Sequence, residues 1–216
     1  MEIIRLHLAR FNVIEEPWPV HGFVIPHPRL GAVLVDTGCG GPEQMMRDYR
    51  VVNRAVEDAL AEHGLSPADV KAVINTHLHF DHCGQNAVFK HAPVYVQRSE
   101  LERARRESPD IREWFDYTGA VFELLDGDAE LAPDLHVVAT PGHTVGHQSV
   151  LAETAPGRQE VMVGDAAFTA DIWAKPDEDP GLPLQFDDQD AWSRSLHRLQ
   201  DMGPARVHFC HDERSA

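Results

Sequence analysis

Short runs of apolar residues, several alternating with polar ones, recur along the chain and end at turn residues. This pattern predicts β-strands, because a strand with one face in a core repeats every two residues. The expected strands cover residues 3–11, 31–38, 71–76, 93–97, 135–143, 148–154, 160–166 and 206–211, and two more are expected around a glycine-containing turn within 120–131.

Helical spacing separates these runs. Apolar residues between positions 42 and 63 recur every three or four places, and Gly64 gives a stop. A short helical turn is expected after Ser66, with Pro67 in its first position. Further helices are expected over 99–107, where Ser99 and Glu102 have the spacing of a capping box, and over 111–117 and 189–203. Mixed strands and helices predict an α/β fold, and the length suits one domain spanning residues 1–216.

Charge and composition disfavour several classes of partner and cellular location. The formal net charge of −16 disfavours nucleic acid and anionic membrane surfaces as partners. No apolar stretch approaches the length of a bilayer span, and the charged N-terminus lacks a signal-peptide centre, so a cytoplasmic location is expected. Three scattered cysteines do not make a disulfide framework. The sequence leaves the oligomeric state open.

The clearest chemical signal is the stretch THLHFDHCG at residues 76–84. It places His77, His79, Asp81 and His82 directly after an expected strand. Three later strands also run into a metal-capable residue. These residues are His143, Asp165 and His211. Functional groups belong on loops that a rigid sheet holds in place, and here that arrangement occurs four times.

The residue types indicate metal ions. Imidazole nitrogens and carboxylate oxygens suit zinc first, with iron or manganese as alternatives. Five histidines and two aspartates exceed the needs of one four-coordinate ion, so two divalent ions bridged by a carboxylate are expected. Which residue serves which ion is not decided by the sequence pattern.

These motifs resemble the metallo-β-lactamase superfamily. HLHFDH is followed in order by His143, Asp165 and His211, and the resemblance covers residues 32–212. Within the superfamily the chain is most similar to the N-acyl homoserine lactonases. The stretches that carry this likeness are AVLVDTG, THLHFDHCGQN, PVYVQRSELERA, TPGHTVGHQSVLAET and FCHD.

The resemblance implies a four-layer αββα sandwich and a hydrolase that opens a lactone ring by attack of a hydroxide bridging two metal ions. It implies that His77, His79 and His143 hold one ion and that Asp81, His82 and His211 hold the other. Asp165 would bridge both ions. Asp81 would also carry a proton to the leaving oxygen. The implied substrate is an N-acyl homoserine lactone or a related lactone, which gives a role in quorum quenching.

One position departs from the family pattern. The lactonases usually have a tyrosine three residues after the bridging aspartate, and its hydroxyl helps to polarise the lactone carbonyl. This chain has Phe168 there. The contact is therefore absent, and either the metal ions alone polarise the carbonyl or the substrate differs.

Four further features surround the expected site. Asp36 is expected either to hydrogen-bond a ligand histidine or to cap a turn, and His147 either to orient a ligand or to be a buried polar residue without such a role. Phe80 is expected to line the substrate cleft or to pack under its loop. The acidic, proline-rich segment 175–190 suits either a lid or a solvated connection.

Two other functions stay open. A thioester or carboxylic ester hydrolase of the same fold is the alternative enzyme, although the chain has no long segment after His211 of the kind that holds glutathione in the hydroxyacylglutathione hydrolases. A metal-binding sensor or scaffold without catalysis is the third hypothesis. Turnover of a lactone panel separates it from an enzyme.

Overall fold

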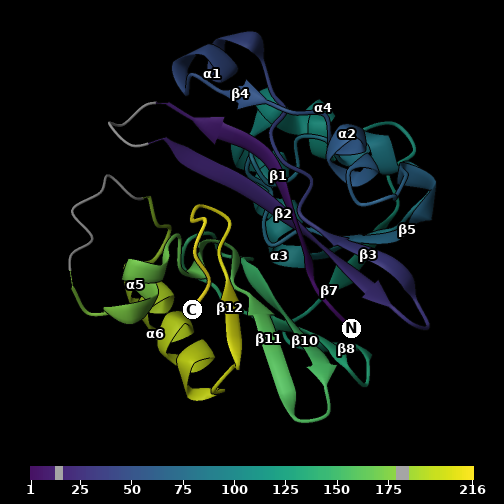
Figure 1. Cartoon of the computed structure of the whole chain (residues 1–216). Coiled ribbons are helices and arrows are strands. Elements are labelled where there is room, and N and C mark those ends of the chain that lie inside the picture. Colours follow the sequence, from purple (N-terminus) through teal and green to yellow (C-terminus); the bar gives the residue numbers. More distant parts are fainter. Residues whose placement is uncertain (13–16, 179–184) are drawn as a thin grey trace.

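The structure is a computed structural model that describes residues 1–12, 17–178 and 185–216. Its strands alternate with short helices along the chain (Figure 1). The strands are β1 Ile4–Phe11, β2 Trp18–His27, β3 Gly31–Val35, β4 Val52–Asn53, β5 Val70–Ile74, β6 Val94–Gln97, β7 Phe122–Leu125, β8 Ala129–Ala132, β9 Leu135–Ala139, β10 Gln148–Ala155, β11 Arg158–Met162 and β12 Arg206–His208.

Most of the helices are short. The α-helices are α1 Glu43–Asp48, α2 Val56–Ala61, α3 Arg98–Glu107, α4 Arg112–Phe115, α5 Ala170–Ala174 and α6 Gln189–Asp201. Single 3₁₀ turns are η1 Pro67–Asp69, η2 Asn86–Phe89, η3 Pro109–Ile111 and η4 Gly164–Ala166. Among the described residues, no helix combines the length and the apolar character needed to cross a bilayer.

The described strands form two sheets. The first has the order β4-β1-β2-β3-β5-β6-β7 and the second the order β12-β11-β10-β9-β8. β3, β5, β6 and β7 run parallel, so the ends of these strands open on the same edge of the first sheet. That edge carries the loop after β5, which begins with the HLHFDH motif.

The apolar clusters of the interior show four layers of secondary structure. One apolar cluster lies between the two sheets, with Phe23 and Ile74 from the first and Leu135 and Met162 from the second. A second cluster packs α2 on the outer face of the first sheet, and a third packs α5 and α6 on the outer face of the second. Figure 1 shows α5 and α6 beside β12, at the opposite end of the molecule from α1. The expected αββα sandwich is confirmed.

Two of the differences from the sequence expectations concern strands. β2 was not expected, and its central residues are buried on both faces, so it lacks the alternation that marks a half-exposed strand. The helix expected over 42–63 is interrupted, because β4 pairs with β1 between α1 and α2. Arg50 has a left-handed φ of 47° at the break. Pairing with a neighbouring strand here overrides the helical spacing.

Of the two helix starts predicted from serine residues, one is present as expected and one is not. Ser66 precedes η1 with Pro67 at its start, as expected, and both the N–H and the hydroxyl of Ser66 donate to Asp69 Oδ2. The capping box expected at Ser99 is wrong. α3 begins at Arg98, straight after β6, and no side-chain cap is formed there.

The two strands around Gly127 are present as β7 and β8, but they belong to different sheets. Gly127 has a φ of 90°, in the left-handed region that glycine tolerates. The chain therefore passes from the first sheet to the second at this turn. This crossing brings His143, Asp165 and His211 to the edge that carries the HLHFDH loop.

Candidate metal centre

The loop after β5 is tightly folded. The N–H groups of His82 and Cys83 both donate to the His79 carbonyl, at 3.0 and 3.1 Å. At its end, Gly84 lies against Gly40, and a Cβ on Gly84 would come within 1.8 Å of the Gly40 nitrogen. Only glycine fits at this contact, so the loop is held against the turn after β3.

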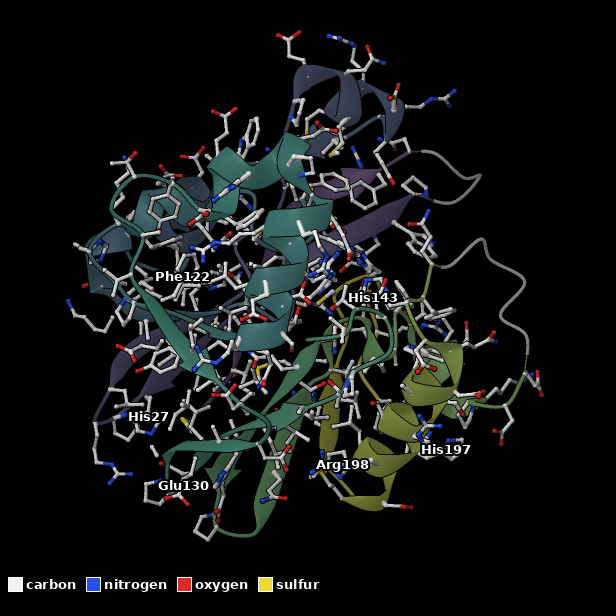
Figure 2. The ribbon with its side chains drawn as sticks, turned by 180° about the vertical axis from the view of Figure 1, so that it is seen from behind. His27, Phe122, Glu130, His143, His197 and Arg198 are labelled. Atoms are coloured by element: carbon white, nitrogen blue, oxygen red, sulfur yellow. The ribbon has the colours of Figure 1, made fainter. Side chains whose placement is uncertain are left out.

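Three ring nitrogens converge in a first triad. His77 Nε2 and His143 Nε2 each lie 3.0 to 3.1 Å from the other and from His79 Nδ1. His77 and His79 come from the loop after β5, and His143 comes from the loop after β9 in the other sheet. Figure 2 shows His143 where the teal and green parts of the chain meet.

A second triad lies beside the first. It contains Asp81 and His82, from the same loop after β5, and His211, which follows β12. Asp81 Oδ2 lies 3.5 Å from His82 Nε2 and 3.6 Å from His211 Nε2. All three residues are buried.

Asp165 stands between the two triads. Its Oδ2 lies 3.2 Å from His143 Nε2 and 3.8 Å from His77 Nε2, on the side of the first triad. Its Oδ1 lies 3.4 Å from His82 Nε2 and 3.5 Å from His211 Nε2, on the side of the second. One carboxylate oxygen therefore faces each triad.

The donor set fits divalent ions. Three ring nitrogens cannot all hydrogen-bond one another, since a ring nitrogen that carries a proton has no lone pair left to accept with, but a metal ion at about 2.0–2.1 Å from each would suit all three. On the side of the second triad, His82 Nε2 and the Asp165 Oδ1 that faces it are buried and have no hydrogen-bond partner. Such atoms cost free energy unless they bind something, and a cation would serve both.

Burial and neighbouring charges shift the pKa values of the triad histidines in opposite directions. Burial lowers the pKa of His77 and His79 well below the ordinary value, so both rings stay neutral and keep a lone pair. Burial also disfavours a charge on His82, but the surrounding carboxylates, Asp165 first, outweigh it and raise the pKa of His82 well above its usual range. The carboxylates around His82 therefore favour a positive charge at the second triad.

Asp36 holds His82 from the side of the ring that faces away from the triad. Asp36 Oδ2 accepts from His82 Nδ1 at 2.8 Å, and the same carboxylate accepts the N–H and the hydroxyl of Thr76 at 2.8 and 2.7 Å. Of the two roles expected for Asp36, the structure shows the hydrogen bond to a histidine. This bond orients Nε2 of His82 toward Asp165.

His147 acts on Asp165 rather than on a histidine of the triads. Its Nε2 accepts the N–H of Asp165 at 2.9 Å, and its Nδ1 lies 3.1 Å from the carbonyl of Thr140. Burial lowers the pKa of His147 to about 3, which keeps Nε2 free to accept. Trp192 Nε1 donates to the Asp165 carbonyl at 3.0 Å. The backbone of Asp165 is thus fixed from both sides.

Backbone carbonyls set the tautomers of two more histidines. His143 Nδ1 donates to the carbonyl of Gln185 at 2.9 Å, and His211 Nδ1 donates to the carbonyl of Pro19 at 2.9 Å. In the neutral form of both rings, Nε2 is left to face Asp165 with a lone pair. Gln185 belongs to the segment 175–190, and the part of that segment at 179–184 lies outside the described residues, so its lid role stays a prediction.

Sequence reasoning missed one supporting residue. Glu100 on α3 is fully buried, and its Oε1 accepts the N–H of Leu78, between His77 and His79, at 2.9 Å. Arg103 pairs with the same carboxylate at 2.6 Å. The only signal in the sequence was an acidic residue close to the start of an amphipathic helix, where solvent exposure is the usual outcome.

A cavity of about 390 Å³ opens on the two triads. Phe80 and Phe168 both line it, together with Phe11 of β1, Trp18 of β2, Met45 of α1, Tyr49 directly after α1 and Ile111 of η3. The Phe168 ring lies between two histidines, with its centroid 5.3 Å from that of His143 and 6.0 Å from that of His211. The para position of Phe168 carries no donor for a molecule in this cavity.

The fold and the two triads together define a metallo-hydrolase, and comparison with known proteins agrees. The family model described as Metallo-beta-lactamase superfamily matches residues 17–211. The chain belongs to this superfamily.

Within the superfamily, the relatives that this chain matches include N-acyl homoserine lactonases. An N-acyl homoserine lactonase from Bacillus sp is 30% identical over 187 residues, in an alignment that covers 80% of this chain and 72% of that protein. The N-acyl homoserine lactonase AttM of Rhizobium radiobacter is 33% identical over 190 residues, in an alignment that covers 76% of this chain and 70% of that protein. A crystal structure of a quorum-quenching N-acyl homoserine lactone lactonase superposes with a TM-score of 0.81 at 25% identity, covering 98% of this chain and 92% of the other.

Proposed function

We propose that the protein is a dinuclear metal-dependent hydrolase that opens the ring of an N-acyl homoserine lactone or a related lactone. The observation that carries this proposal is the placement of Asp165, with one oxygen facing each triad. Asp165 would therefore help to hold two ions, and it lines the cavity together with residues of both triads.

The proposed ligands are seven residues. Six belong to the two triads, and the seventh is Asp165, whose carboxylate lies between them. His77, His79 and His143 would hold one ion, Asp81, His82 and His211 the other, and Asp165 both. Zinc is the proposed metal, because imidazole and carboxylate donors in small, closely spaced sets suit it. When bound, two such ions polarise a carbonyl and make hydroxide available at neutral pH.

Asp81 is the proposed proton carrier. Its carboxylate lines the cavity and is only 8% exposed, so bulk water has little access to it. Ring opening breaks the bond between the acyl carbon and the ring oxygen, and the departing alkoxide needs a proton. In this proposal Asp81 receives the proton that the attacking water gives up and delivers it to that oxygen.

The cavity suits a small ring with an apolar chain. Phe80 and Phe168 are proposed to contact the substrate, and the aromatic walls exclude water from it. The relatives named as N-acyl homoserine lactonases support this substrate class. We also propose that residues 1–216 act as one domain, since one apolar cluster joins both sheets.

One observation favours an alternative. Phe168 offers no hydrogen bond to a carbonyl, although the family's lactonases usually have a tyrosine here. A carboxylic ester or thioester whose carbonyl needs no such donor is therefore the second candidate substrate for the same site.

A hydrolysis screen of the metal-loaded protein tests both candidates. Lactones of varied acyl chain, simple esters, thioesters and phosphodiesters are compared, with release of the acid as the readout. The matched controls are His143→Ala, which removes a proposed ligand, and His63→Ala, which removes an exposed histidine outside the triads. Lactone turnover that survives His63→Ala and disappears in His143→Ala supports the proposal. Turnover of esters or thioesters alone supports the alternative, and no turnover of any substrate contradicts both.

A further inference from the structure

A third group of metal-capable side chains lies apart from the two triads. His7 on β1 and His21 on β2 face each other across the antiparallel pair, with ring centroids 5.5 Å apart. Glu213, in the segment after β12, reaches both rings. Its Oε2 lies 3.5 Å from His21 Nε2 and its Oε1 lies 3.9 Å from His7 Nδ1.

Within this group, His21 is the side chain whose ring nitrogens lack a bonding partner. Its side chain is fully buried, and neither of its ring nitrogens has a hydrogen-bond partner. Burial lowers the pKa of His21 to about 3, so the ring is neutral and keeps a lone pair. A buried imidazole without a partner is unfavourable, and the nearest carboxylate sits beyond ordinary hydrogen-bond distance from it.

We propose that His7, His21 and Glu213 form a separate binding site for a divalent transition-metal ion, with zinc as the preferred ion. Two imidazoles and one carboxylate are a donor set that zinc accepts, and water completes the coordination. The candidate ligand atoms lie within 4.8 Å of one another. The side chains of His7 and Glu213 are 46% and 64% exposed, so they can rotate toward an ion and leave it a path from solvent.

Arg5 competes for Glu213. Its Nη2 lies 3.5 Å from Glu213 Oε2, and both side chains are substantially exposed. An exposed ion pair of this kind contributes little, since water and salt screen it. A coordinated ion that also satisfies the buried His21 ring offers the stronger interaction for the Glu213 carboxylate.

The site joins β1 to two segments that meet beside the second triad, β2 and the segment after β12. The N–H of His21 donates to the carbonyl of Cys210 at 2.9 Å, and the carbonyl of Pro19 accepts from His211 Nδ1. An ion held by His7, His21 and Glu213 would fasten β1 and β2 to the segment that carries His211. Its role is to hold that segment in place, apart from the chemistry of the triads.

Zinc uptake measured by equilibrium dialysis tests this proposal. The full chain is compared with His7→Gln and Glu213→Gln, and His63→Gln serves as the control at an exposed histidine outside every candidate group. At saturating free zinc, the unaltered chain and the control should each bind one equivalent more than either of the two variants. The comparison is a difference, so it holds whatever number of ions the triads bind.

Equal uptake by all four proteins overturns the proposal. So does a loss in Glu213→Gln without a loss in His7→Gln, because Glu213 is close to His211 in the chain and could disturb the second triad alone. Failure of the triads to bind any metal would leave the unaltered chain with one equivalent and the two variants with none. That result would contradict the proposed dinuclear function and support this site.

Discussion

The carboxylate of Asp36 and the imidazole of His82 meet at 2.8 Å, Oδ2 to Nδ1, on the side of the ring that faces away from the second triad. Asp36 adopts this position with a left-handed φ of 58°, which asparagine and aspartate tolerate better than other side chains. Its carboxylate also accepts from Thr76, so the orientation of His82 is linked to the end of β5.

Asp36→Asn should weaken metal binding with the fold kept. Asparagine suits the same backbone conformation but lacks the negative charge that favours a proton on His82 Nδ1. Residues that orient a ligand in this way typically account for about 10–100-fold in metal affinity. Metal content after dialysis against a graded chelator measures the loss. Asp69→Asn, at an exposed cap, is the control, and equal retention by both variants contradicts the prediction.

Asp81→Asn should lower kcat far more than it raises KM. The proposed proton transfer belongs to the transition state, and an interaction lost only there leaves substrate affinity nearly unchanged. General acid–base groups contribute about 10²–10⁴-fold. Steady-state kinetics on a lactone, with metal content measured in the same sample, makes the check. Normal turnover at normal metal content rules out the proton-carrier role.

Phe168→Tyr should increase turnover of acyl homoserine lactones. The ring already lines the cavity between His143 and His211, so a para hydroxyl would add a donor where the carbonyl is expected. A well-placed donor of this kind is worth about 2.7–4 kcal/mol in the transition state. Phe186→Tyr adds the same hydroxyl to a neighbouring ring as the control. No gain in a normally folded Phe168→Tyr protein would favour the ester and thioester alternative.

Glu100→Gln should destabilise the protein strongly. Glu100 and Arg103 have side chains that are 0% and 6% exposed, and the change leaves the Arg103 charge without its partner. Breaking one side of a buried ion pair costs about 3–5 kcal/mol. Asp126→Asn removes an exposed partner of Arg98 and should cost at most about 1 kcal/mol. Urea unfolding compares the two, and similar midpoints would show that Glu100 is not needed to hold the motif loop.

Acid should destabilise the metal-free protein through His147. Its pKa is about 3 in the folded chain, below the ordinary value of 6.5, so the unfolded chain takes up the proton first. The stability that this residue contributes is full above about pH 6.5 and is lost progressively as the pH falls toward about 3.

His147→Gln should flatten this decline, because glutamine can accept the Asp165 N–H without titrating. Urea unfolding of chelator-treated protein from about pH 7 to about pH 4 gives the slope. The slope should not vanish, since burial also lowers the pKa of His21 to about 3. An unchanged slope in His147→Gln excludes the residue as a source, and His63→Gln is the control.

The triads were the most predictable part of the molecule, and the reason is local. Each residue follows a strand closely, and parallel strands bring such ends to one edge. The division into two sets was expected from the family resemblance alone, since spacing does not reveal how His143 and His211 come together in space. The distances to Asp165 supply that division.

The parts that could not be predicted depend on contacts distant in sequence. β2 carries prolines at positions 19 and 26 and is buried on both faces, so neither alternation nor turn residues marked it. β4 formed where helical spacing predicted a turn of helix, because β1 offered it a strand to pair with. Glu100 was missed since burial of a carboxylate is decided by its partners, Leu78 and Arg103, and sequence spacing does not show the backbone of Leu78 near α3.

Each triad takes residues from both sheets. During folding, docking of the sheets must therefore precede completion of the metal site. His77 and His79 follow a strand of the first sheet, whereas His143 follows a strand of the second, and the same split separates Asp81 and His82 from His211. Neither triad is complete until the sheets have docked, so cation uptake in a refolding experiment marks the docking step. Ions that bind after docking would stabilise the docked sheets. They would therefore slow the separation of the two sheets more than they would speed docking.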